Sequence, residues 1–181
     1  MTMKERHATG HENLTLVLGG ARSGKSDHAL KLAMAAAPPW IFVATAEALD
    51  AEMQERIKRH KEMRGEGWVT LEAPIDLAGA MEQAPVDTPV VIDCFTLWLS
   101  NLMLGECNVD SEIGRFDEAL GARSAATIAV ANEVGLGIIP ETPLGRAFRD
   151  QAGALNRHLA AQAGKVILMV AGLPLTIKPG Q

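Results

Sequence analysis

Eight residues near the start of the chain have the types and spacing needed to hold a triphosphate. The string GGARSGKS at residues 19–26 matches the pattern G-x-x-x-x-G-K-[ST], directly after an apolar run and directly before a segment of helical composition. Its glycines let several backbone N–H groups point at one anion, and the helix N-terminus adds partial positive charge. The alternative is a chance match in a glycine-rich turn, which we reject because strand, loop and helix follow in the required order. The predicted nucleotide contacts here are Gly19, Gly20, Ala21, Arg22, Ser23, Gly24, Lys25 and Ser26.

Two side chains of this loop have catalytic chemistry of their own. Lys25 is predicted to reach the β- and γ-phosphates, and the hydroxyl of Ser26 is predicted to bind Mg²⁺. A second metal ligand is expected at the end of a buried strand, and Asp93 follows the apolar run VVI. The residue type leaves another interpretation of Asp93 open, as a capping residue for a helix that starts near Thr96.

A third group with suitable chemistry is His60, on a predicted helix of residues 50–64 where Ile57, His60 and Arg64 share one face. A neutral imidazole can attack phosphorus when metal and cations neutralise the leaving group, and Lys61 and Arg64 stand nearby. Residue type and spacing alone also allow a solvated or packing histidine. The other histidines lie in the tail or on helices without an evident partner: His7, His11, His28 and His158.

These residues must be positioned by a sheet. Short apolar runs alternate with longer stretches of helical period, which indicates a parallel sheet covered by helices. We therefore predict an α/β fold of the P-loop NTPase type, in three layers, with a mostly parallel sheet covered by helices on both faces. The predicted strands are residues 14–18, 40–44, 68–71, 90–93, 126–131, 165–171 and 175–178.

Helices are expected at residues 25–36, 50–64 and 96–104, and less clearly within 108–125, where glycine and arginine blur the period. Another long helix is predicted to begin at the N-cap Thr142 with Pro143 at its first position, and to end at Gly164. We see no internal repeat or linker, so residues 14–181 are interpreted as one domain after a flexible tail of residues 1–13. The buried stripe of the long helix is expected to be Leu144, Phe148, Ala152, Leu155 and Leu159.

Composition bounds the function. The 181 residues are 48% hydrophobic and 22% charged, and 17 basic against 22 acidic residues give a net charge of -5. Nothing here resembles the basic footprint of a nucleic-acid-binding protein. Only Cys94 and Cys107 are present, and Cys94 lies in an apolar run where a structural disulfide is not expected, which is typical of a reducing compartment. Without a signal-peptide pattern or an apolar run of membrane length, we expect a soluble, cytoplasmic protein.

Several strings, taken in order, resemble one family over nearly the whole chain after residue 13: the bifunctional adenosylcobinamide kinase/adenosylcobinamide-phosphate guanylyltransferases of cobalamin biosynthesis. The P-loop alone is shared by very many proteins, but this order of motifs is specific. The strings are LVLGGARSGKS at 16–26, VATAEALDAEMQERIKRHKEMRGEGWVTLEAP at 43–74, VIDCFTLWLSNL at 91–102, NEVGLGIIPETPLGRAFRDQAGALNRHLA at 132–160 and VAGLPLTIK at 170–178.

The resemblance implies two reactions: phosphorylation of adenosylcobinamide by ATP or GTP, and transfer of GMP from GTP to the resulting phosphate. It implies that a histidine is guanylylated, and the matching position is His60; the neighbouring position, which also holds histidine in the family, is Arg59 here. It also implies a homotrimer. Asp93 stands where some members carry Glu, which keeps a carboxylate for Mg²⁺. The further guanine-nucleotide contacts that it implies are Glu47, Ala48, Leu49, Arg64, Glu72 and Asp93.

Two other functions fit parts of this pattern. One is a P-loop kinase of a small metabolite without a covalent intermediate, in which His60 is structural. The other is a nucleotide-dependent switch, in which hydrolysis gates a partner. After the strand at 126–131, Asn132 and Glu133 with the turn at 135–137 form a loop at the edge where parallel sheets bind ligands, although a plain glycine turn is the alternative.

Overall fold

The elements follow the alternation expected of a parallel sheet. The computed structural model describes residues 10–47, 54–55, 61–62 and 64–180, and the elements below are those within these ranges. The strands are β1 (His11–Gly19), β2 (Trp40–Ala44), β3 (Trp68–Glu72), β4 (Val90–Asp93), β5 (Thr127–Asn132), β6 (Ala163–Val170) and β7 (Leu173–Lys178). The helices are α1 (Lys25–Ala33), α3 (Leu77–Gln83), α4 (Phe95–Leu104), α5 (Val109–Gly121) and α6 (Pro143–Gln162).

The seven strands form one sheet in the order β3-β2-β4-β5-β1-β6-β7. All neighbouring strands run parallel except β7, which is antiparallel to β6 at the edge. Parallel central strands are covered on both faces and are therefore largely apolar, as the buried residues 128–131 (IAVA) of β5 illustrate. The predicted α/β fold with a mostly parallel sheet is confirmed.

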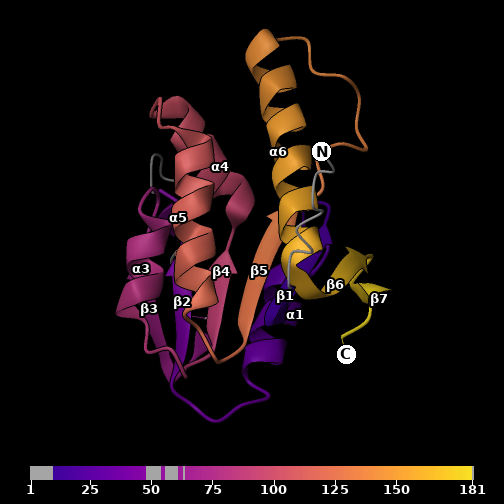
Figure 1. Cartoon of the computed structure of the whole chain (residues 1–181). Helices are drawn as coiled ribbons and strands as arrows, with labels where there is room; N and C mark the ends of the chain where they lie inside the picture. The colour runs from indigo at the N-terminus through magenta and orange to yellow at the C-terminus, as the bar shows by residue number, and fades with distance from the viewer. Residues whose placement is uncertain (1–9, 48–53, 56–60, 63, 181) are drawn as a thin grey trace, which may run out of the picture.

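Helices cover both faces of this sheet. Figure 1 shows α3, α4, α5 and α6 on the near side, where they enclose a core that includes Phe95, Trp98 and Phe116. On the other face α1 packs its buried Ala29 and Ala33 against β1, β4 and β5. The three layers predicted from the sequence are therefore present.

Most differences from the predicted elements lie at their ends. The strand β1 begins at His11, so residues 11–13, which we assigned to the tail, belong to the sheet. The helix α1 stops at Ala33, three residues earlier than predicted, and α3 was not predicted. Its seven residues span too few turns to show a period, and only the capping side chain of Asp76 marks its start. Of the predicted helix at 50–64, residues 54–55, 61–62 and 64 are helical, and the rest lies outside the described residues.

The long helix α6 starts as predicted, because the hydroxyl of Thr142 accepts a hydrogen bond from the Gly145 N–H at 3.1 Å. Two details were wrong. Leu144 is 56% exposed, since the helix projects beyond the sheet at its first turn (Figure 1). Gly164 does not end the helix: α6 ends at Gln162 and Gly164 lies inside β6, where the backbone of Glu12 leaves no room for a side chain.

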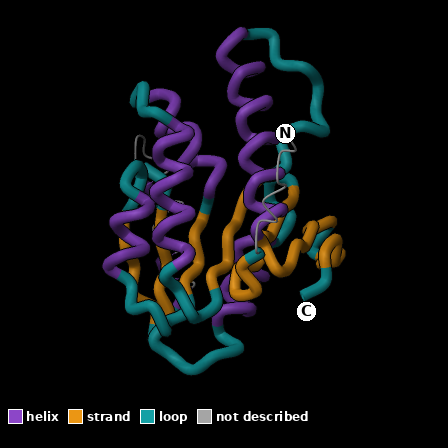
Figure 2. The backbone as a smooth tube through the Cα atoms, viewed as in Figure 1, coloured by secondary structure: helices purple, strands orange, loops and turns teal. Residues whose placement is uncertain are grey.

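The carboxyl ends of β1, β2, β4 and β5 meet at one edge of the sheet. A long loop of residues 133–142 leaves this edge after β5 and reaches the far end of α6 (Figure 2). No helix among the described residues is long and apolar enough to cross a membrane. Ligand sites of parallel α/β sheets lie outside the carboxyl ends of the strands, so this edge is where the predicted site residues must be compared.

Candidate functional site

The glycine-rich loop joins β1 directly to α1. Gly24 is the N-cap of α1 with φ 88°, and no side chain caps this helix end. At Gly19, with φ 153°, an added Cβ would lie 2.6 Å from the Ser23 hydroxyl and 2.7 Å from the Met169 carbonyl oxygen. Only glycine fits these two positions, and the resulting curl directs the start of the helix toward the edge of the sheet.

Lys25 and Ser23 point into this loop. The Lys25 side chain is only 8% exposed, and its Nζ donates a hydrogen bond to the Gly20 carbonyl at 2.6 Å. The Ser23 hydroxyl is buried and has no hydrogen-bond partner among the described residues. A buried hydroxyl without a partner costs free energy, so a ligand oxygen in the loop would supply what the protein does not. These groups fit a bound phosphate.

Strand register places Asp93 and Glu72 at the same edge as the loop. Ala44 at the end of β2 pairs with Glu72 on one side and Asp93 on the other, while Gly19 pairs with Asn132 at the end of β5. Asp93 therefore ends β4, as predicted. The capping interpretation is wrong: the N-cap of α4 is Cys94 without a side-chain bond, and the Thr96 hydroxyl accepts from the Asn132 N–H at 2.7 Å.

Arg64 brings a positive charge to this region. Its guanidinium lies 3.8 Å from the centre of the Phe42 ring and donates to the Thr70 hydroxyl at 3.2 Å, and the residue is only 8% exposed. Burial lowers the pKa of Arg64, and the charge of Asp93 acts in the opposite direction. The two predicted contacts Arg64 and Asp93 are thus close enough to interact electrostatically.

An ion pair ties the same helical segment to β3. Lys61 Nζ and Glu72 Oε1 are 2.8 Å apart, with side chains 45% and 69% exposed. Such an exposed pair contributes only about 0–1 kcal/mol to stability. We therefore interpret it as a contact that helps to position Lys61 beside β3. Together with the bond from Arg64 to Thr70, it anchors Lys61 and Arg64 to β3.

Three of the predicted site residues, Ala48, Leu49 and His60, lie outside the described residues. Glu47 is exposed in the segment that follows β2 at the same edge. The structure thus brings the loop, Arg64, Glu72 and Asp93 to one edge. Their roles and that of His60 stay predictions.

Sequence reasoning missed the residues that hold this edge together. Thr45 binds the backbone beside Asp93, where the peptide bond from Asp93 to Cys94 is cis, and Asn101 in turn donates to the Thr45 carbonyl. Asn156 on α6 donates to the Asn132 carbonyl at 3.1 Å. Their partners are main-chain groups far away in the sequence, and the only signal is a hydroxyl or amide residue next to a buried strand or inside a helix.

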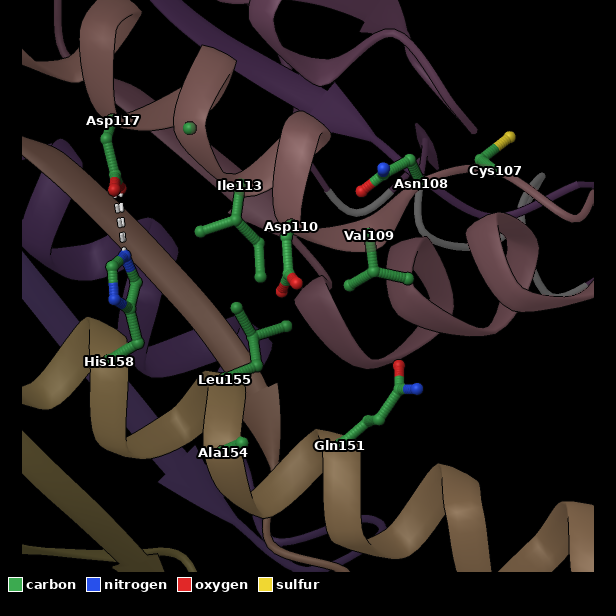
Figure 3. A pocket seen from close by; sticks show the side chains of 11 residues that line it. Cys107, Asn108, Val109, Asp110, Ile113, Asp117, Gln151, Ala154, Leu155 and His158 are labelled. Atoms are coloured by element: carbon green, nitrogen blue, oxygen red, sulfur yellow. Dashed lines mark hydrogen bonds and ion pairs between the residues drawn. The ribbon is translucent and has the colours of Figure 1, made fainter.

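A cavity of about 660 Å³ lies elsewhere, between α5 and α6. Figure 3 shows Asp117 on α5 directed toward His158 on α6, and His158 Nε2 lies 2.9 Å from Asp117 Oδ2. His158 therefore has a partner, contrary to our expectation. None of the predicted nucleotide contacts lines this cavity, so we do not assign it to the nucleotide. Its other lining residues include Asp110 and Gln151.

The two thiols are free, and only one is accessible. Burial, and then the negative charge of Asp93, raises the pKa of the Cys94 thiol to about 11, whereas Cys107 is half-buried. The thiolate is the reactive form, so at about pH 8 we expect an alkylating reagent to label Cys107 and spare Cys94. Mass spectrometry of the native and denatured protein measures this. Cys107→Ser is the control and should remain unlabelled until unfolding; labelling of Cys94 at the rate of Cys107 would contradict the assignment.

Comparison with known proteins identifies the family. Residues 15–177 match the family model described as cobinamide kinase / cobinamide phosphate guanyltransferase. The chain belongs to this family. Its members are transferases that combine a kinase and a guanyltransferase, as the resemblance of the sequence implied.

Curated relatives agree over their full length. The chain is 41% identical over 166 residues to the bifunctional adenosylcobalamin biosynthesis protein CobP of Pseudomonas aeruginosa, covering 90% of this chain and 96% of the relative. It is 38% identical over 182 residues to the protein named CobU of Salmonella typhimurium, covering 91% and 99%.

Solved structures support the fold alone. Flagellar accessory protein FlaH from Methanocaldococcus jannaschii aligns with a TM-score of 0.53 at 15% identity, covering 94% of this chain and 80% of that chain. A Pyrococcus horikoshii protein, described as Project ID PH0250, aligns with a TM-score of 0.53 at 9% identity, covering 96% and 90%. At these identities, the neighbours carry no argument about substrates.

Proposed function

We propose that this chain phosphorylates adenosylcobinamide and then transfers GMP from GTP to adenosylcobinamide phosphate through a guanylylated His60. The main support is the meeting of the Lys25 loop and the Asp93 carboxylate at one sheet edge, within a chain that matches this family from residue 15 to 177. The product would be adenosylcobinamide-GDP, with pyrophosphate leaving in the second reaction.

For the kinase reaction, the protein's contribution is placement and charge. The loop N–H groups and Lys25 would hold the β- and γ-phosphates of ATP or GTP. The corrinoid hydroxyl would attack the γ-phosphorus, which breaks the bond from this phosphorus to the bridging oxygen and releases ADP or GDP, while the hydroxyl proton passes to water. The hydroxyl of Ser26 and the carboxylate of Asp93 are hard oxygen donors of the kind that Mg²⁺ takes together with substrate phosphates and water. When bound there, Mg²⁺ would neutralise charge on the phosphates.

For the transferase reaction, the bond that breaks is the one between the α-phosphorus and the pyrophosphate of GTP. The imidazole of His60 would attack this phosphorus, and Lys25 with the loop N–H groups would stabilise the departing pyrophosphate. A phosphate oxygen of the corrinoid would then attack the same phosphorus, which breaks the P–N bond and restores the imidazole. Arg64, which already lies beside Asp93, supplies further positive charge for the nucleotide.

Mass spectrometry of the protein tests this function directly. After incubation with GTP and Mg²⁺ but without corrinoid, we expect the chain to gain the mass of one GMP, located on the peptide that contains His60. Added adenosylcobinamide phosphate should remove the label and yield adenosylcobinamide-GDP. An unlabelled protein that phosphorylates a small metabolite would favour the simple kinase, and failure to turn over the corrinoid in the absence of any partner protein would favour the switch.

We further propose that the enzyme is a homotrimer of single-domain chains that acts in the cytoplasm. Apolar side chains of the edge strand β7, namely Leu173, Leu175 and Ile177, are 71%, 54% and 58% exposed, and Ile138 in the loop after β5 is 97% exposed. Large exposed apolar groups of this kind are typical of interfaces. Native mass spectrometry should therefore give three times the chain mass of 19.3 kDa; a monomer at micromolar concentration would contradict the proposal.

A further inference from the structure

Thr45, the residue that directly follows β2, forms hydrogen bonds to the backbone at the end of β4. The ladder between β2 and β4 ends at Ala44 and Asp93. Beyond it, the Thr45 N–H donates to the Asp93 carbonyl at 3.3 Å. The Thr45 hydroxyl then accepts from the Cys94 N–H at 2.7 Å and donates to the Cys94 carbonyl at 2.8 Å. Thr45 is fully buried, so water does not compete for these bonds.

Asn101 on α4 holds Thr45 from the other side. Its amide group donates to the Thr45 carbonyl at 2.8 Å and to the Pro74 carbonyl at 3.0 Å. Pro74 follows β3 by two residues, so this one amide links the turns that follow β2 and β3. The N–H group, the carbonyl and the hydroxyl of Thr45 therefore all have hydrogen-bond partners.

Thr45 therefore fixes the backbone that follows the Asp93 side chain, and the ladders of β4 with β2 and β5 hold the strand that precedes it. The side chain itself remains partly accessible at the sheet edge, between the loop at Gly19 and the guanidinium of Arg64. A ligand carboxylate is useful only if its oxygens stand at the correct place, and groups that orient it contribute to affinity although they never touch the ligand.

We infer that Thr45, supported by Asn101, is a positioning residue that aims the Asp93 carboxylate at the Mg²⁺-nucleotide. This inference rests on the proposed role of Asp93 in the kinase and transferase reactions. Thr45 itself touches neither metal nor nucleotide; it acts through the Asp93–Cys94 backbone.

Thr45→Val tests the inference because valine keeps the shape of threonine and removes the hydroxyl. The measurement is the affinity for a fluorescent, non-hydrolysable GTP analogue, with Mg²⁺ and with EDTA, so that no turnover is needed. We expect Thr45→Val to reduce the Mg²⁺-dependent gain in affinity by roughly 10- to 100-fold and to leave the affinity in EDTA unchanged. Thr45→Ser retains the hydroxyl and should restore the gain to within about threefold of the wild type.

Thr127→Val is the matched control. Thr127, at the amino end of β5, is the other threonine among the described residues with 0% exposure, and its hydroxyl accepts from Arg123 Nε at 3.3 Å. Thr127→Val removes a buried threonine hydroxyl, as Thr45→Val does, but at the opposite end of the strands. We expect a lower Tm with an unchanged Mg²⁺-dependent gain. If Thr45→Val behaves like Thr127→Val, the positioning role is wrong.

Two more variants complete the experiment. Asn101→Leu removes the support of Thr45 and should act in the same direction, which decides the question if Thr45→Val does not fold. Asp93→Asn separates the inference from the function on which it rests. If Asp93→Asn leaves the Mg²⁺-dependent gain intact, the proposed metal role of Asp93 fails; if it removes the gain while the Thr45 and Asn101 variants keep it, only the positioning inference fails.

Discussion

Replacing Lys25 with methionine is expected to lower the kcat of both the kinase and the guanylyltransferase reactions by roughly 10²- to 10³-fold. The ammonium group is the buried positive charge of the loop, held 2.6 Å from the Gly20 carbonyl, and both reactions need charge stabilisation at the phosphates. Methionine has a similar length and suits a residue that is 8% exposed. Separate assays of corrinoid phosphorylation and of GMP transfer measure the effect.

Lys31→Met is the matched control for this prediction. Lys31 lies on the same helix, in its last turn and exposed, and it is not part of the loop. Its variant should keep both activities within about twofold, because an exposed lysine away from the site contributes little. If Lys25→Met retains activity comparable to that of Lys31→Met while its Tm is unchanged, the loop lysine does not stabilise the transferred phosphates.

His60→Ala is expected to separate the two reactions. Loss of the nucleophile should reduce GMP transfer by at least about 10³-fold and abolish the covalent label, because the proposed phosphoramidate forms on this imidazole. The kinase rate should change only slightly, since direct attack by the corrinoid hydroxyl needs no covalent intermediate. Incubation with α-labelled GTP, followed by acid treatment, detects the acid-labile adduct.

The control for His60 is another histidine of the chain. His158→Gln alters a residue that is paired with Asp117 beside the α5–α6 cavity, away from the predicted nucleotide contacts. It should take up the label as the wild type does. An undiminished label on His60→Ala would rule out His60 as the nucleophile, and a transferase rate that stays normal without any label would exclude a covalent mechanism.

Periodicity predicted the fold well because central strands and amphipathic helices are local patterns. The strands at 40–44 and 90–93 were predicted to the residue, since each is an apolar run bounded by polar or turn residues. Errors occurred where local pattern competes with tertiary packing. The stripe of α6 was extended to Leu144, but the first turn of this helix projects beyond the sheet, and Leu144 is 56% exposed there. The short helix α3 carries too few turns to show a pattern.

The site was predictable where its chemistry is contained in one segment. The loop at residues 19–26 combines strand end, glycines, lysine and helix start, so its sequence specifies its geometry. Asp93 was identified because an acid at the end of a buried strand is unusual and useful at the edge of a parallel sheet. Neither argument needed a distant contact.

By itself, the sequence determined that this chain has a phosphate loop, a carboxylate at the end of a buried strand, and an order of motifs that identifies its family. Only the tertiary structure decided which groups meet. It placed Arg64 over Phe42 within reach of the charge on Asp93, paired His158 with Asp117, and bonded the backbone after Asp93 to Thr45, which Asn101 holds in turn. The physical reason is separation along the chain: Thr45 and Cys94 are 49 residues apart, and no local pattern records which buried hydroxyl will satisfy which backbone group.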